Sequence, residues 1–304
     1  MKEVVSTDEF LKKILSSSKK DFLFAFYDHR LGVICKDPRL FLIPIDDHLV
    51  HRGDGVFETI KFVFKKIYLL KEHLERMKRS CSKIFLDPPC PWEEIEDIVK
   101  DVVRVSEREK GVISIFIGRG CGGFSVDIDE CKTSSLYVVC RKFPDYPKEM
   151  WDKGVKACKV SIPAKQSYLS QIKSVNYLPN VLMKREAKKK GYDYPVCFTE
   201  DGYLAEGATE NICIVKNGKL LIPEPSRILL GTTLKRAIEL SKIDYKFCAL
   251  KEKDLYSADE IILLGTTIDA LSVVKYNEKT IGDGTPGEVS KLFRSLLIKD
   301  QQSC

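Results

Sequence analysis

Two side chains in the second half of the sequence stand where they could do chemistry. Lys173 lies in "QIKSVNYLPNVL" (171–182), about one turn before Pro179, a residue that favours the first turn of a helix. A lysine that is held at such a loop or strand end and partly desolvated can act as an amine nucleophile, although most single lysines are surface residues. Glu206, in "YLAEGATEN", ends a predicted strand just before a glycine. A carboxylate there is either a plain turn residue or a group that points at a ligand nitrogen.

Two turns with the letters GTT follow pairs of leucines. The first, in "LLGTTLKRAIEL", begins a predicted helix at residues 231–233, so free backbone N–H groups and two hydroxyls would face one point. The second, in "LLGTTIDAL", repeats the pattern at residues 265–267 after a buried strand. One such turn is ordinary capping, but two suggest a shared anion. Arg76, in "KEHLERM", is a possible charge-assisted partner.

A nucleophilic lysine, a carboxylate and a phosphate cradle together suggest pyridoxal 5'-phosphate. Lys173 would form the Schiff base, and Glu206 would keep the pyridine nitrogen protonated so that the ring withdraws electrons. Arginine, threonines and helix N–H groups would bind the phosphate.

These stretches resemble, in the same order, those of the class IV aminotransferases, the fold-type IV family of pyridoxal-phosphate enzymes. That family contains branched-chain aminotransferases, D-amino-acid aminotransferases and 4-amino-4-deoxychorismate lyases. The resemblance spans roughly residues 40 to 298. The stretches that carry it are "GDGVFETIK" (53–61), "EHLERM" (72–77), "IKSVNYLPNVL" (172–182), "DGYLAEGATEN" (201–211), "ILLGTTLKRA" (228–237) and "LLGTTIDAL" (263–271).

The resemblance implies roles for individual residues. Lys173 would be the Schiff-base lysine and would also shuttle a proton between the substrate Cα and C4' of the cofactor. Glu206 would bind the pyridine nitrogen, and Tyr177 would lie near the cofactor's ring oxygen. The residues implied for the phosphate are Arg76, Thr232, Thr233 and Thr266. Phe57, Thr59 and Lys61 alternate along one strand and therefore share a face, which the resemblance assigns with Thr267 to the substrate.

The sequence favours an aminotransferase that moves an amino group from a branched-chain or D-amino acid to a 2-oxo acid. The alternative is a 4-amino-4-deoxychorismate lyase that releases pyruvate, towards which "VFET" (56–59) and "GRGCGG" (118–123) lean. D-amino-acid enzymes of the family bind the substrate carboxylate with an arginine–histidine pair, whereas Arg119 has no histidine after it. A basic interaction module built on "KREAKKK" (184–190) would leave Lys173 and Glu206 unexplained.

The elements that must position these residues are mixed helices and strands, so the fold class is α/β or α+β. Proline-rich residues 143–154 predict a linker between an N-terminal domain at 1–142 and a C-terminal domain at 155–304. The resemblance implies an α/β first domain and a barrel-like, cofactor-binding second domain. The helix after Lys173 is expected to bury a stripe made of Leu178, Val181 and Leu182.

Composition limits the other possibilities. The 304 residues carry 50 basic and 44 acidic side chains spread along the chain, which argues against a nucleic-acid surface. The 11 cysteines include no C-x-x-C pair, which favours a reducing, cytoplasmic location. The four histidines have no metal-ligand spacing, and no apolar run is long enough for a membrane. The partners expected are an amino acid, a 2-oxo acid and, from the resemblance, a second copy of the chain in a homodimer.

Overall fold

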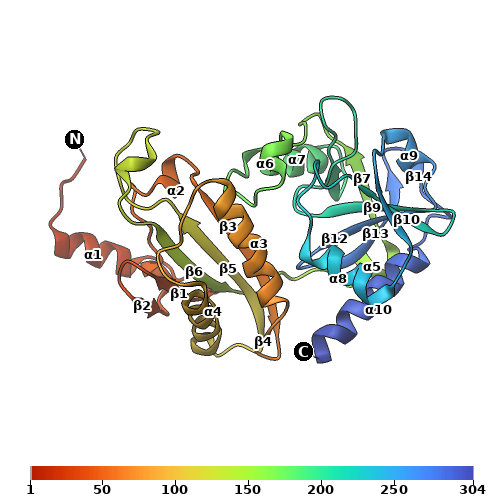
Figure 1. The fold of residues 1–304 in the computed structure, drawn as a ribbon. Helices are drawn as coiled ribbons and strands as arrows, with labels where there is room; N and C mark the ends of the chain where they lie inside the picture. Colours follow the sequence, from red (N-terminus) through yellow and green to blue (C-terminus); the bar gives the residue numbers. More distant parts are fainter. Residues whose placement is uncertain (1, 304) are drawn as a thin grey trace. The chain divides into compact units, whose positions relative to one another are not determined.

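The structure is a computed structural model that describes residues 2–303, apart from the side chain of Ser167. The chain forms two compact units, one up to Phe143 and one from Pro144 onwards (Figure 1). The segment 143–154, expected as a linker, contains the short helix α5 (Glu149–Lys153). Within residues 2–303, no helix has the length and apolar character needed to cross a membrane.

The N-terminal unit is built on a six-stranded sheet with the order β2-β1-β6-β5-β3-β4, in which every pair is antiparallel. Helices α3 and α4 lie against this sheet and contact each other (Figure 1). The strands are β1 (Leu23–Asp28), β2 (Val33–Cys35), β3 (Gly55–Val63), β4 (Lys66–Ile67), β5 (Lys110–Gly118) and β6 (Ser135–Arg141). The helices are α1 (Thr7–Ser16), η1 (Pro38–Leu40), α2 (His48–His51), α3 (Leu70–Lys83), α4 (Trp92–Ser106) and η2 (Ile128–Glu130).

Local sequence explains the elements of this unit. A capping box precedes α1, because Ser6 and Glu9 bind each other's backbone N–H groups. Helix α3 buries one face through Leu74, Met77 and Cys81, which recur at helical spacing. That face holds α3 against β3, the strand that carries three of the predicted substrate residues.

The C-terminal unit contains an eight-stranded sheet with the order β11-β10-β9-β12-β13-β7-β8, and β14 pairs with β13. Helices α8 and α10 pack on each other and contact β12, while α7 contacts β7 and β8 (Figure 1). The strands are β7 (Val155–Lys159), β8 (Tyr194–Val196), β9 (Asn211–Lys216), β10 (Lys219–Pro223), β11 (Tyr245–Cys248), β12 (Glu260–Gly265), β13 (Asp269–Tyr276) and β14 (Lys279–Thr280). The remaining helices are α6 (Ser167–Ser170), α7 (Leu178–Lys189), α8 (Thr232–Ser241), α9 (Glu252–Tyr256) and α10 (Glu288–Ser303).

The prediction for the buried face of α7 was wrong. Leu178 is 69% exposed and Val181 60% exposed. The helix instead buries Asn180, Met183 and Ala187, which recur at three- and four-residue intervals. Met183 and Ala187 pack in one hydrophobic cluster with Cys158 of β7 and Cys197. A helix this short can bury only one stripe against its own unit, so the opposite apolar residues stay at the surface of the chain.

Candidate active site

Lys173 lies in the loop between α6 and α7, as expected from its position before Pro179. Its side chain is half-buried, while its neighbours Ile172 and Ser174 are 2% and 5% exposed and anchor the loop. The Lys173 Nζ donates a hydrogen bond to Tyr177 Oη at 3.4 Å. The loop therefore holds an amine at the edge of the unit, beside a phenol from the start of the next helix.

Glu206 occupies an irregular stretch that bridges to Asn211 just before β9. Its Oε2 accepts a hydrogen bond from the backbone N–H of Leu229 at 3.2 Å. Among residues 2–303, no hydrogen-bond donor reaches the other oxygen, Oε1. Burial raises the pKa of Glu206 to about 7, although the Leu229 N–H and the charges of Lys173 and Lys165 act in the opposite direction. A carboxyl with this pKa can share a proton with a ring nitrogen near neutral pH.

Asn211 organises the segments around Glu206, and the sequence analysis gave it no role. Its Oδ1 accepts the N–H of Gly231 at 2.9 Å, and its Nδ2 donates to the carbonyl of Leu229 at 2.9 Å. Asn211 is also the first residue of β9 and pairs with Leu264 of β12. The Asn211 side chain thus links the segment before α8 to the start of β9, which pairs with the end of β12. The sequence signal for this role is a polar amide side chain, Asn211, as the first residue of the otherwise apolar run "NICIV".

The first GTT turn begins α8 as predicted. Gly231 is the N-cap residue, and no side chain caps the helix. Thr232 and Thr233 are both 6% exposed. A Cβ on Gly231 would come to 2.2 Å from Asn211 Oδ1, so only glycine permits this close approach. An uncapped helix start with two buried hydroxyls suits a phosphate group.

The second GTT turn has a different setting. Thr266 and Thr267 lie in the tight connection between β12 and β13, where Gly265 pairs with Asp269. The Thr267 hydroxyl is 3.1 Å from Tyr146 Oη. The turn therefore follows a buried strand as expected, but it presents backbone from a β-hairpin and not from a helix.

Lys165 is a second amine at this site, which the sequence analysis missed. Its Nζ lies 4.6 Å from the centroid of the Tyr177 ring, and that of Lys173 lies 5.8 Å from the same centroid. Burial lowers the pKa of Lys165, and Lys173 adds to this effect, whereas Glu206 opposes it. Nothing in the spacing of "IPAKQSYLSQIK" distinguishes Lys165 from a surface lysine.

The predicted residues of the N-terminal unit lie on both sides of β3. Arg76 of α3 forms two hydrogen bonds of 2.7 Å with the fully buried carboxylate of Glu58, and His73 contacts the same group at 2.6 Å. Burial raises the pKa of Glu58, but Arg76 and then His73 outweigh burial, so the pKa falls well below its usual range. Arg76 is therefore oriented by a carboxylate, and its contact with a phosphate stays a prediction.

The opposite face of β3 carries the three residues predicted for substrate. Phe57 and Thr59 are half-buried, and Lys61 is 2% exposed. Phe57 stacks on Phe116 of β5, with 6.0 Å between ring centroids. The Lys61 ammonium lies 5.3 Å from the centroid of the Tyr68 ring. The strand thus presents an aromatic and two polar side chains on one face, as the alternation predicts.

Comparisons with known proteins identify the family. A family model described as amino-transferase class IV matches residues 55–276. This chain belongs to the class IV aminotransferases. It is 34% identical over 301 residues to the chloroplastic D-amino-acid transaminase of Arabidopsis thaliana, covering 95% of this chain and 79% of that protein. It is 31% identical to a putative branched-chain-amino-acid aminotransferase of Methanocaldococcus jannaschii, covering 83% of this chain and 88% of that protein.

Comparison with solved structures supports the same family. The T.th. branched-chain amino acid aminotransferase with pyridoxamine 5'-phosphate superposes with a TM-score of 0.87 at 25% identity, covering 94% of this chain and 96% of that one. This confirms the two-domain fold-type IV architecture and a pyridoxal-phosphate-dependent transaminase. The uncapped α8, the open oxygen of Glu206 and the Lys173 amine fit that cofactor. The comparisons do not favour the lyase alternative, because the relatives found are transaminases.

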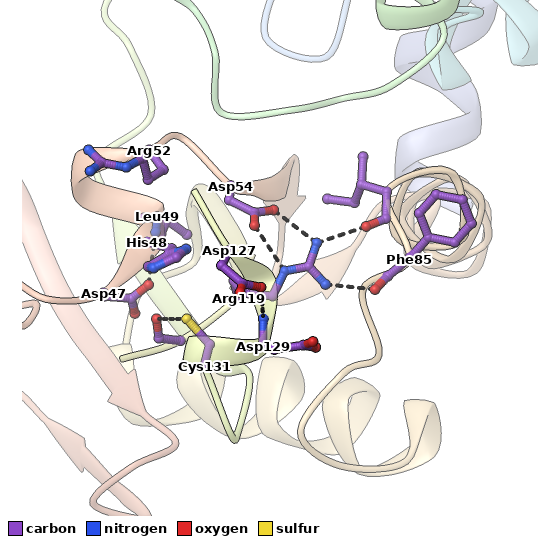
Figure 2. Close-up of polar contacts among 12 residues, drawn as sticks. Asp47, His48, Leu49, Arg52, Asp54, Phe85, Arg119, Asp127, Asp129 and Cys131 are labelled. Carbon is purple, nitrogen blue, oxygen red and sulfur yellow. Dashed lines mark hydrogen bonds and ion pairs between the residues drawn. The ribbon is translucent and has the colours of Figure 1, made fainter. Parts of the chain in front are cut away.

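Arg119 has a structural role in this aminotransferase. Its Nε and Nη2 bind both oxygens of Asp54 at 2.9 and 3.1 Å, as Figure 2 shows. Its Nη1 and Nη2 donate to the carbonyls of Phe85 and Ile84 at 2.6 and 2.8 Å. These carbonyls follow the C-terminus of α3, where a cation is favourable. With 9% of its surface exposed, Arg119 ties α3 to the end of β5.

Proposed function

We propose that this transaminase transfers the amino group of a largely apolar amino acid, of the branched-chain or D-amino-acid type, to a 2-oxo acid, with Lys173 as the lysine that holds the cofactor. The observation that supports this proposal is the grouping in the C-terminal unit. The Lys173 amine and the Glu206 carboxyl interact electrostatically, and Asn211 joins Glu206 to the start of α8.

Each residue has a defined task in this proposal. Glu206 would bind the pyridine nitrogen through its open oxygen, and Tyr177 would lie near the ring oxygen. The groups that would bind the phosphate are the first N–H groups of α8 and the side chains of Arg76, Thr232, Thr233 and Thr266. Pyridoxal phosphate, when bound, withdraws electrons from the Cα of the amino acid. Lys173, in its uncharged form, would take the Cα proton. Its hydrogen bond to the Tyr177 hydroxyl would help to hold the amine in position.

The substrate assignment rests on β3 and on the relatives. Phe57, stacked on Phe116, offers apolar surface to a side chain, while Thr59, Lys61 and Thr267 offer donors for a carboxylate. The guanidinium of Arg119 donates hydrogen bonds to Asp54 and to two backbone carbonyls, so Arg119 is not assigned to the substrate. The relatives named above are a D-amino-acid transaminase and a putative branched-chain-amino-acid aminotransferase, which supports an amino-acid substrate of one of these two types.

We also propose that the enzyme is a cytoplasmic homodimer. The exposed apolar residues Leu178, Val181 and Leu182 of α7 form a surface that a second copy could cover. The cytoplasmic location is supported by the cysteines, because all ten that lie within residues 2–303 are free thiols. The eleventh, Cys304, lies outside the described residues.

A half-reaction tests the activity. Single L- and D-amino acids are added to the cofactor-loaded protein without an acceptor, and we expect about one 2-oxo acid per subunit from the preferred donors. If no amino acid yields product while 4-amino-4-deoxychorismate yields pyruvate, the lyase alternative is correct.

Borohydride reduction of the loaded protein tests the lysine. Trypsin does not cleave at a modified lysine, so a label on Lys173 gives a peptide spanning residues 166–184. A label on Lys165 would instead give residues 160–173, and would contradict the assignment of Lys173.

A further inference from the structure

A cleft with a volume of about 640 Å³ lies in the C-terminal unit beside α5, β13 and α10. Both helices pack against β13 (Figure 1). The volume is in the range of small-molecule binding sites in proteins. None of the residues that line the cleft is assigned above to the cofactor or to the substrate. The cleft is therefore a second candidate site, built from a different set of residues.

One wall of the cleft is a single face of α10. The residues of this helix that line the cleft recur at intervals of three and four positions, and they include Lys291, Arg294, Ser295, Ile298, Lys299 and Gln302. Lys291 pairs with Glu288 at 3.0 Å, and Asp152 of α5 is the carboxylate among the described lining residues. Within residues 2–303, Arg294 and Lys299 form no salt bridge. The lining therefore keeps an excess of positive charge.

The Arg294 guanidinium lies above an aromatic ring at the opposite wall. It is 4.7 Å from the centroid of the Trp151 ring, and its side chain is half-buried. The Trp151 ring is fixed in turn, because its Nε1 donates a hydrogen bond to the carbonyl of Ile268 at 3.0 Å. Among the residues that the structure describes, the Arg294 guanidinium donates no hydrogen bond, so its N–H groups are available to an anion.

Ser272 supplies a buried hydroxyl from β13. It lies two residues after Ala270 and therefore on the same face of the strand, the face on which Ala270 packs against Phe293 and Leu297 of α10. Ser272 is 6% exposed, and its Oγ has no hydrogen-bond partner within residues 2–303. A buried hydroxyl without a partner is unfavourable, and a ligand oxygen or a ligand-bound water in the cleft would remove that cost.

We propose that this cleft binds the phosphate monoester of a small organic molecule. A phosphate monoester carries a charge of about −1.5 to −2 and three acceptor oxygens, which matches a guanidinium, an ammonium and a hydroxyl on one cleft. A carboxylate has only two oxygens and one charge, so it matches this set of donors less well. The cleft also has room for the organic part, which Pro286 and Ile298 would contact. This proposal does not depend on the choice of amino donor or on the role of Lys173.

The experiment measures binding of a probe to the cofactor-loaded protein, in which the phosphate group of the cofactor already occupies its own site. The probe is phenyl phosphate, and benzoate is the carboxylate of similar shape. Dissociation constants are obtained from saturation-transfer NMR titrations at low ionic strength. The variant is Arg294→Met, which removes the charge but keeps an apolar chain beside Trp151. Arg185→Met, an exposed position on α7, is the matched control for the loss of one positive charge.

We expect phenyl phosphate to bind the parent saturably and Arg294→Met at least about tenfold more weakly, because a hydrogen-bonded charged contact is lost. Arg185→Met should agree with the parent within about twofold, and benzoate should bind the parent at least about tenfold more weakly than phenyl phosphate. Absence of saturable binding would overturn the proposal. Equal binding by Arg294→Met would also overturn it, because the probe would then occupy another site. Equal binding of benzoate would exclude the phosphate class. If Arg294→Met does not fold, Lys299→Met provides the same comparison.

Discussion

Glu206→Gln should remove a pH-dependent cost from the folded, cofactor-free protein. Burial raises the pKa of this carboxyl from 4.5 to about 7, which means that the folded state binds the proton more tightly than the unfolded chain does. The ionisation of Glu206 therefore does not affect the free energy of unfolding below about pH 4.5. It lowers this free energy as the pH rises towards 7 and causes no further change above that. At about 1.4 kcal/mol for each pKa unit, ionisation of Glu206 costs the folded protein about 3 kcal/mol. Glutamine cannot ionise and does not incur this cost.

The assay is urea unfolding of the C-terminal unit at several pH values. The chain has two tryptophans, one in each unit, so a Trp92→Phe background leaves Trp151 as the fluorescent probe of the C-terminal unit. We expect the free energy of unfolding of Glu206→Gln, minus that of the parent, to rise by about 3 kcal/mol between pH 4.5 and 8. Glu200→Gln, which removes an exposed carboxylate of the same unit, controls for the loss of one negative charge. A difference that stays within about 0.5 kcal/mol across this range would refute the desolvation argument.

The same variant separates an electronic role from a turn role. Glutamine is nearly isosteric and still accepts the Leu229 N–H, so Glu206→Gln should fold and retain cofactor. It should nevertheless form 2-oxo acid several orders of magnitude more slowly in a single turnover, because it carries no charge to favour a protonated ring nitrogen. A rate within a few-fold of the parent would exclude Glu206 from the site.

Three further variants test the remaining site groups. Glu58→Gln leaves the Arg76 guanidinium buried without a carboxylate and should lower the free energy of unfolding by about 3–5 kcal/mol in urea titrations; a loss below about 1 kcal/mol would contradict a buried ion pair. Arg76→Ala should in addition weaken cofactor retention during dialysis by about 1.5–3 kcal/mol, and retention equal to that of the parent would show that Arg76 does not reach the phosphate. Gly231→Ala would place a Cβ 2.2 Å from Asn211 Oδ1, and we expect at least about tenfold weaker retention in a folded protein. Unchanged retention would place the phosphate elsewhere.

Elements with local determinants could be predicted from the sequence. Helix α3 and strand β3 follow from hydrophobic periodicity, and the turn at Asn217 and Gly218 follows from a pair that tolerates positive φ, which the structure shows at 52° and 74°. The start of α8 was also predictable, because glycine and threonine precede an apolar, helix-forming run. Each of these signals lies within a few residues of the structure it predicts.

Features set by tertiary contacts could not be predicted in this way. Asn211 acquires its role from Gly231 and Leu229, which lie about twenty residues further along the chain. Lys165 becomes distinctive only because α7 brings Tyr177 beside it. The buried face of α7 was predicted wrongly because the helix has apolar residues on two sides, and local sequence does not say which side meets the sheet.

Arg76 and Arg119 show why residue type alone does not assign an arginine. Both are buried and both bind a carboxylate, so either could be taken for a ligand-binding group. Arg119 also donates to two backbone carbonyls that follow α3, and a guanidinium fixed to a helix end serves the fold. Arg76 lies within α3, and its described bonds go to Glu58 and His73 of the same unit. Because Glu58 orients the guanidinium, Arg76 is preorganised in the way a phosphate-binding arginine must be. The two arginines therefore differ in the partners described for them, which are side chains for Arg76 and include two backbone carbonyls for Arg119.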